Sequence, residues 1–398
     1  LEYRAYREFL VDLLIDHNPS FKGTKGQLVR LAQKLIDRCI FVMFCEDMGE
    51  QLSFPPNALS DYLSELSKSQ TFDEEEQDAW KKFRSRPINR FNGGLFAADA
   101  ALEGLRIPNS AFCTKFQGES DTSLRANRKS LLYFAGVYNF GAAEREGKAI
   151  SLYTLGRIFE QSITELEYLE AEKEGRESLA KVSKRKRDGV YYTPEWVVER
   201  VVAETLGSRL DEIRADLGWQ LELEGDETAI AKQVAKSASQ QSDTFKKHVS
   251  AVKAFRDRLE TFTVIDPACG SGAFLIHTLE YLLRERRRVQ RELALVTGGK
   301  GDGLFEFKAE DEIRSILSKN VFGVDINPAS VEIARLALWL HTAKSDQPLS
   351  NLDTNIVAGN SLVGKEVYDF KKDLLNATAE KKETINAFEY AEEFSSVF

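Results

Sequence analysis

One stretch of the sequence has the residue types of a ligand-binding turn. Residues 264–274 read VIDPACGSGAF, so an apolar segment ends in Asp266 and continues into a turn that contains Gly270 and Gly272. Because glycine has no Cβ, the backbone can turn tightly there and approach a ligand closely. The Asp266 carboxylate suits a ligand ammonium group. A dinucleotide loop would need a third glycine where Leu275 stands, and the GK[ST] of a P-loop is absent, so the turn favours a cationic or zwitterionic ligand over a pyrophosphate.

Two further polar positions follow apolar segments. Asp325 ends the next one, where an acid can accept hydrogen bonds from ribose hydroxyls, although a structural role stays open for it. Asn327 and Pro328 have a sufficient explanation as the cap and first residue of a helix. Asn360, within the sequence GNSL, has two interpretations of equal weight. Its amide can read an adenine edge, or it can serve only in a turn.

The elements that must position these residues form an alternating pattern. Short apolar segments at 262–265, 321–324 and 355–357 predict strands, and helices are expected to begin at Ala273 and Pro328. Strand, helix, strand, helix, strand is typical of an open parallel sheet with helices on both faces. We therefore expect an α/β fold, with the first half of a Rossmann-like parallel sheet after a largely helical N-terminal domain.

The domain boundary is expected in a charged stretch. Residues 27–48 have apolar positions at helical spacing, and strand-like alternation is scarce before residue 180. The charged run at 170–188 then separates a helical domain, 1–183, from a second domain, 184–398. In that second domain, Thr193-Pro194 is expected to open a helix, with the threonine as N-cap.

Composition excludes several classes of protein. With 398 residues, 42% of them hydrophobic, the chain is long enough for two or three packed domains. A formal charge of −9 argues against a dedicated nucleic-acid clamp, and we interpret the basic runs at 184–187 and 284–288 as solvated faces, with phosphate binding as the lesser alternative. No apolar run reaches membrane-spanning length. Four scattered cysteines without a CxxC pair indicate a reducing, cytoplasmic setting and no metal site.

These motifs together resemble those of a known family. DPACGSGAF, GVDINP and GNSL, in that order, resemble motifs I, II and III of S-adenosylmethionine-dependent adenine-N6 DNA methyltransferases. GVYYTP at 189–194 resembles their motif X, and its position before motif I is similar to the gamma arrangement. FNGGLF at 91–96 and GRIFE at 156–160 are similar to segments of the type IIG and type IIL restriction-modification enzymes and of BREX phage-defence methyltransferases.

The resemblance implies S-adenosylmethionine as cofactor and double-stranded DNA as the partner of the full-length protein. A nuclease domain or defence-system proteins would be further partners, and no membrane is implied. Carried over motif by motif, the cofactor-binding residues would be Tyr191, Tyr192, Thr193, Pro194, Asp266, Pro267, Ala268, Cys269, Gly270, Gly272, Phe274, Asp325, Ile326, Asn360 and Leu362.

The family's catalytic segment is missing from this sequence. In the family, an Asn-Pro-Pro-Tyr/Phe segment accepts the amino hydrogens of a flipped adenine and stacks on the base. The only Asn-Pro pairs here are 18–19 and 327–328, and neither continues into that motif. We therefore assign no catalytic residue, and expect the front portion of a methyltransferase that is inactive alone. A methyltransferase acting on RNA or on a protein glutamine, and a non-catalytic module that binds cofactor or a partner, stay open as alternatives.

Overall fold

The computed structural model divides the chain into two compact units. Unit 1 comprises Leu1–Tyr192 and Arg335–Asp353, and unit 2 comprises Thr193–Ala334 and Thr354–Phe398. The predicted boundary at 183/184 lies outside the described residues. The structure describes residues 2–48, 55–85, 96, 98–116, 130–138, 166, 169, 172–173, 175, 193–299, 309–342, 352–366, 386–395 and 397.

The described part of unit 1 is helical, as the sequence predicts. Its longest helix, α2, confirms the helix expected at 27–48. The aromatic rings of Trp80, Phe83 and Phe112 pack together in the core of unit 1. The elements are α1 (Glu2–His17), α2 (Lys25–Met48), α3 (Ala58–Lys68), α4 (Asp78–Ser85), α5 (Ala100–Glu103), the 3-10 turn η3 (Asn109–Ala111) and α7 (Leu131–Val137).

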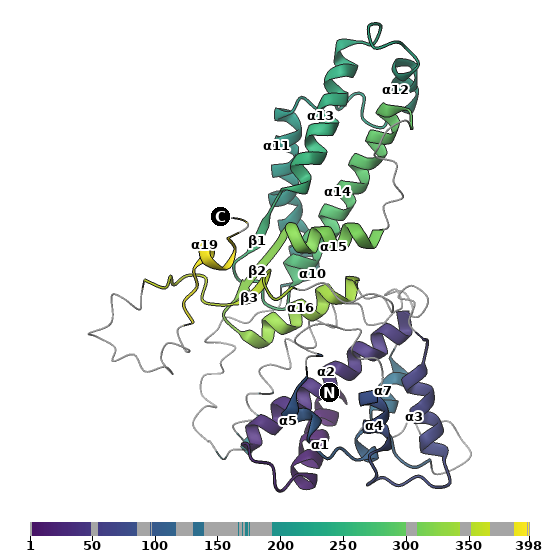
Figure 1. The fold of residues 1–398 in the computed structure, drawn as a ribbon, viewed down its shortest axis with the longest axis vertical. Coiled ribbons are helices and arrows are strands. Elements are labelled where there is room, and N and C mark those ends of the chain that lie inside the picture. Colours follow the sequence, from purple (N-terminus) through teal and green to yellow (C-terminus); the bar gives the residue numbers. More distant parts are fainter. Residues whose placement is uncertain are drawn as a thin grey trace. The chain divides into compact units, whose positions relative to one another are not determined.

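A three-stranded parallel sheet lies in unit 2. Its strands, in spatial order, are β1 (Val264–Asp266), β2 (Val321–Asp325) and β3 (Ile356–Ala358) (Figure 1). Asp266 pairs in register with Gly323, and Asp325 with Ala358. The three predicted strands are thus confirmed, and because they are parallel, the segments that follow them leave at one edge of the sheet.

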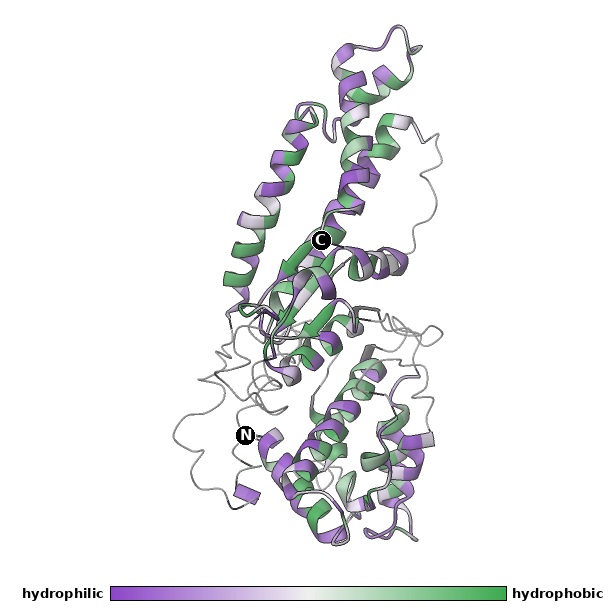
Figure 2. Ribbon diagram, turned by 60° about the vertical axis from the view of Figure 1, so that its left-hand side comes forward, coloured by the Kyte–Doolittle hydropathy of each residue, from purple (hydrophilic) through white to green (hydrophobic). Residues whose placement is uncertain are grey.

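Residues on the two faces of β2 pack differently. Phe322 and Val324 point to one face, where Phe388 and Phe394 cover them. Gly323 points to the other, where a Cβ would meet Leu275 of α14 at 2.8 Å. The central strand is therefore buried on both faces, whereas β1 and β3 are partly exposed, and Figure 2 shows the strands as largely hydrophobic.

Helices surround the sheet and extend beyond it (Figure 1). α14 begins at Ala273 and α16 at Pro328, as predicted, but α10 begins one residue later than expected because Pro194 takes an extended ψ of 141° and becomes the N-cap. No described helix is both long and apolar enough to cross a membrane. The elements are α10 (Glu195–Val202), the π-helical η5 (Ala203–Gly207), α11 (Ser208–Asp216), α12 (Glu227–Val234), α13 (Asp243–Glu260), α14 (Ala273–Thr297), α15 (Ala309–Lys319), α16 (Pro328–Thr342) and α19 (Tyr390–Glu393).

Candidate ligand-binding site at the carboxyl edge of the sheet

The turn after β1 is fastened to the neighbouring strand. The Cys269 N–H donates to the Val324 carbonyl at 2.9 Å, and the Gly272 N–H donates to the Cys269 carbonyl at 2.8 Å. The first helical bond of α14 follows, from the Ile276 N–H to the Gly272 carbonyl. The segment 267–272 is therefore a closed loop, here called the glycine loop, that connects β1 to α14.

The two glycines of the loop are required for different reasons. Both have left-handed backbones, with φ +52° at Gly270 and +89° at Gly272. A Cβ on Gly272 would lie 3.0 Å from the Cβ of Ala334 in α16, so this glycine permits close packing. A Cβ on Gly270 would meet nothing within 4 Å among the described residues. The space beside Gly270 is therefore open for a ligand to approach the backbone.

Asp266 has one satisfied and one unsatisfied carboxylate oxygen. Oδ1 accepts the Ala268 N–H at 3.0 Å, whereas Oδ2 is buried and has no hydrogen-bond partner among the described residues. Burial raises the pKa of Asp266 above its usual value, and the nearby Asp325 carboxylate raises it further, against the opposing effect of the Ala268 N–H. A buried acceptor without a partner costs free energy, so this oxygen is poised for a donor or cation supplied by a ligand.

Asp325 holds the glycine loop from the end of β2. Its Oδ2 accepts the Gly270 N–H at 2.9 Å, and its Oδ1 accepts the Asn327 N–H at 2.8 Å. The carboxylate thus joins the loop after β1 to the turn after β2. A carboxylate has about four lone-pair sites, so one acid can serve several donors at once.

Asn360 lies next to this acid but uses its side chain locally. The Gly359 N–H donates to the Asp325 carbonyl at 2.8 Å, which places the third turn beside the second. The Asn360 Oδ1 accepts the Leu362 N–H at 3.2 Å, and its own N–H donates to the Asn386 carbonyl at 2.7 Å. This geometry matches the turn role that the sequence left open for Asn360.

The other predicted site residues differ in burial and in whether the structure describes them. Cys269 is buried, Phe274 is half-buried, and both Pro267 and Ala268 are exposed. Ile326 is 36% and Leu362 93% exposed, so both side chains are accessible at the surface. Thr193 and Pro194 precede α10, which packs beside α14. Tyr191 and Tyr192 lie outside the described residues.

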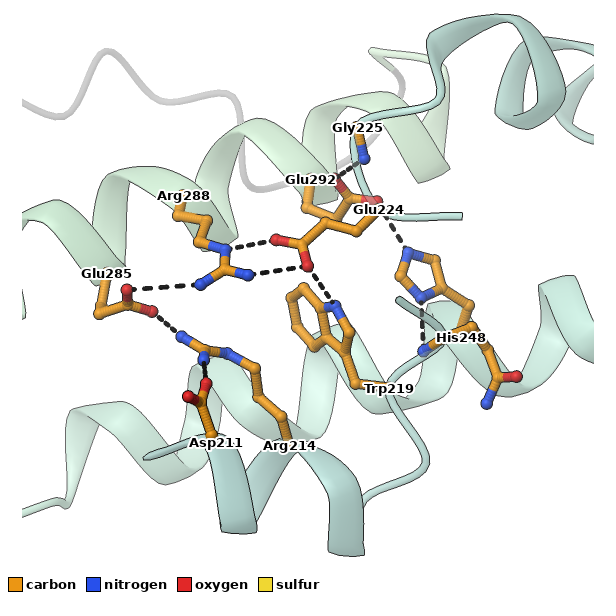
Figure 3. A network of polar contacts seen from close by, with 10 residues as sticks. Asp211, Arg214, Trp219, Glu224, Gly225, His248, Glu285, Arg288 and Glu292 are labelled. Carbon is orange, nitrogen blue, oxygen red and sulfur yellow. Dashed lines mark hydrogen bonds and ion pairs between the residues drawn. The ribbon is translucent and has the colours of Figure 1, made fainter. Parts of the chain in front are cut away.

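A second group of polar residues, most of them buried, lies in the helical arm formed by α11–α14 (Figure 3). Arg214 of α11 is buried and pairs with Glu285 of α14 and with Asp211. Its guanidinium also lies 4.7 Å from the ring centre of Phe255. Burial lowers the pKa of Arg214, and the charge of Arg288 lowers it further, while the neighbouring acids oppose the shift.

The arm contains two more acids, the half-buried Glu224 and the buried Glu292, each with both oxygens occupied. Glu224 accepts from Arg288 and from the Trp219 indole N–H at 3.1 Å. Glu292 accepts the Gly225 N–H at 3.1 Å and bonds to His248 Nε2 at 2.7 Å (Figure 3). Because the protein itself supplies the hydrogen-bond donors for these acids, we interpret the network as one that stabilises the packing of the helices.

Sequence reasoning missed this network. The run at 284–288 was interpreted as a solvated face, but Arg288 pairs with Glu224, and the Nη2 group of Arg286 donates to Asn320 at 2.8 Å. The only signal was the helical period, which distributes a consecutive run around α14 and must direct some members inward. Among the described residues, no group of three His, Cys, Asp or Glu side chains is arranged to hold a metal ion.

Comparisons with known proteins give matches of three kinds. Residues 238–362 match the model of the MmeI DNA-methyltransferase domain. The chain is 26% identical over 367 residues to a putative type II restriction enzyme and methyltransferase of Methanocaldococcus jannaschii, an alignment that covers 84% of this chain and 27% of that protein. This chain thus spans about a quarter of the curated relative's length. A structure of the type IIL restriction-modification enzyme MmeI in complex with DNA aligns with a TM-score of 0.46 at 19% identity, over 91% of this chain and 40% of that one.

Proposed function

Because this chain is related to the methyltransferases of type IIG and type IIL restriction-modification enzymes, we propose that unit 2 is the cofactor-binding part of a DNA adenine-N6 methyltransferase. The match over residues 238–362 includes the glycine loop, Asp325 and Asn360. The motif order X, I, II, III supports the adenine-N6 assignment, since it resembles the gamma arrangement of that family.

The unsatisfied oxygen of Asp266 is the observation that carries the proposal. S-adenosylmethionine has a cationic ammonium group, and a buried carboxylate oxygen without a partner suits such a donor. The open space at Gly270 lets the ligand approach the backbone, and Asp325 fixes the loop that borders this space. When bound, the cofactor supplies a methyl group on a sulfonium.

Duplex DNA is the substrate that the proposal assigns to the whole protein. An adenine N6 amine is a poor nucleophile, so the reaction depends on positioning, with the base flipped out of the helix. The residues of this chain serve the cofactor side of that arrangement. The acceptors for the amino hydrogens belong to an Asn-Pro-Pro-Tyr/Phe segment, which this sequence does not contain.

Calorimetric titration with two cofactors tests the proposal. S-adenosylmethionine, or its demethylated product, is expected to bind with a 1:1 stoichiometry, whereas NAD is expected to give no binding heat because the loop lacks the third glycine of a dinucleotide site. Binding of NAD instead of S-adenosylmethionine, or of neither, would contradict the proposed function.

A further inference from the structure

The arginines of α14 divide into an inward and an outward group. Arg286 donates to Asn320 and Arg288 pairs with Glu224, so these two stabilise the unit itself. Arg284, Arg287 and Arg291 are exposed. The sequence run alone does not separate these groups, but the structure does.

The outward arginines form one row. At 100° per residue, Arg284, Arg287 and Arg291 fall within about 60° of one another, and they span about 10 Å along the helix axis. Buried residues of α14, such as Leu282 and Val289, lie on the opposite face. This row of three exposed guanidinium groups is here called the arginine row.

The arginine row has few internal partners. Arg284 lies over the Tyr281 ring at 5.3 Å, and in the described part of the chain no ion pair joins Arg287 or Arg291 to an acid. Arg287 does act at longer range on the pKa of Glu312, together with Arg286.

The surroundings of the row do not neutralise it. Glu280 occupies the same face one turn before Arg284, but it lies within 3.7 Å of His277. Like charges four residues apart, such as Arg287 and Arg291, weaken a helix. The row therefore has a cost to the helix, and among the described residues no ion pair of Arg287 or Arg291 with an acid offsets it.

We propose that the arginine row binds the phosphate backbone of duplex DNA. This inference rests on the proposed function, which makes duplex DNA the substrate. Guanidinium groups bind phosphate through paired N–H donors, and a straight row of three along a helix suits the regular phosphates of one strand. In a chain of net charge −9, such a row is a local source of attraction for phosphate groups.

Salt-dependent DNA binding tests the arginine row. A fluorescent duplex of about 30 base pairs is titrated with the chain at several salt concentrations. In the triple variant Arg284→Gln/Arg287→Gln/Arg291→Gln, the slope of log affinity against log salt is expected to flatten by about 2–3, close to one for each lost phosphate contact. At about 0.1 M salt this corresponds to a loss of roughly 5- to 10-fold in affinity per arginine.

Two matched variants distinguish a loss of DNA binding caused by the arginine row from one caused by a change in net charge or by misfolding. The variant Lys22→Gln/Lys68→Gln/Lys81→Gln removes the same charge from exposed positions of unit 1 and is expected to keep the wild-type slope. The triple lysine variant of the row keeps the charge and is expected to keep most of the affinity. Equal slopes for the wild type and the glutamine row variant, or no salt-dependent binding by the wild type, would overturn the inference. Cofactor titration of the same proteins is independent of this outcome and tests the proposed function separately.

Discussion

Acids that are wholly or partly buried in unit 2 are of two kinds, and they lie in different regions. In the arm, Glu224 and Glu292 have both carboxylate oxygens occupied by partners from the same unit. At the sheet edge, Asp266 is largely buried yet has one oxygen with no described partner. Desolvating a carboxylate costs free energy in both places. The two regions differ in whether residues of the same unit supply the hydrogen-bond donors that offset this cost. The two acids of the arm are satisfied from within the unit, whereas we propose that a ligand completes the acid at the sheet edge.

The pKa directions follow the same division. Burial alone would raise the pKa of Glu224, but the hydrogen bonds and charge of Arg288 outweigh it and lower the pKa. At Asp266, burial raises the pKa, and its closest charged neighbour, Asp325, is another acid that raises it further. A satisfied acid is stabilised as a carboxylate, while Asp266 is destabilised in that form until a cation arrives.

The largest loss of stability is expected when the buried ion pair between Arg214 and Glu285 is removed. Arg214→Ala leaves Glu285 buried without its main partner, which should lower the free energy of unfolding by about 3–5 kcal/mol. Arg209→Ala, on the same helix, removes only an exposed pair with Glu212 and should cost less than about 1 kcal/mol. Urea unfolding monitored by circular dichroism measures both. Equal costs would show that the buried network contributes no more than a surface pair.

Substitution of the two loop glycines is expected to have different consequences, a loss of stability at Gly272 and a loss of cofactor binding at Gly270. Gly272→Ala combines a left-handed backbone with a contact against Ala334, and should cost about 2–4 kcal/mol of stability. Gly270→Ala has only the backbone strain, about 1–2 kcal/mol. Gly270→Val should abolish cofactor binding because its side chain enters the open space, not because it clashes within the protein. Thermal melts and titrations of the three variants decide this, and wild-type affinity in Gly270→Val would contradict the ligand position.

Asp325→Asn tests whether the carboxylate that joins the glycine loop to the turn after β2 also contacts the ligand. The amide retains one acceptor where the carboxylate serves two N–H groups, so cofactor binding should weaken by about 1–2 kcal/mol. Calorimetric titration and a thermal melt are compared on the same sample. A large shift in the melt with unchanged affinity would make Asp325 purely structural.

The smallest effect is a pH dependence of stability without ligand. Because the folded-state pKa of Asp266 is raised, its carboxylate destabilises the fold as pH rises through that pKa, and the cost disappears below the unfolded value. Asp266→Asn removes this titration. The unfolding free energy of the variant minus that of the wild type should therefore increase as pH is raised from about 4 to 8. A difference that stays flat or decreases would contradict a raised pKa.

Local sequence signals predicted the strands and helices that flank the glycine loop better than they predicted the contacts within the arm. The strands before Asp266 and Asp325, and the helices starting at Ala273 and Pro328, follow from short-range patterns of apolar residues, glycine and proline. The network in the arm depends on Glu224 meeting Arg288, 64 residues away, and on the burial of His248. Neither periodicity nor composition specifies which charged residues turn inward, because that depends on the helices that pack beside them.

Cofactor titration of Asp266→Asn tests the central claim most directly. The substitution keeps the acceptor for the Ala268 N–H but removes the charge at the unsatisfied oxygen. We expect the affinity for S-adenosylmethionine to fall about 10- to 150-fold, which corresponds to about 1.5–3 kcal/mol for a hydrogen bond to a charged group. Asp257→Asn, an exposed acid of α13, is the matched control and should bind as the wild type does. Equal affinities for all three proteins would contradict the assignment of Asp266 to the ligand.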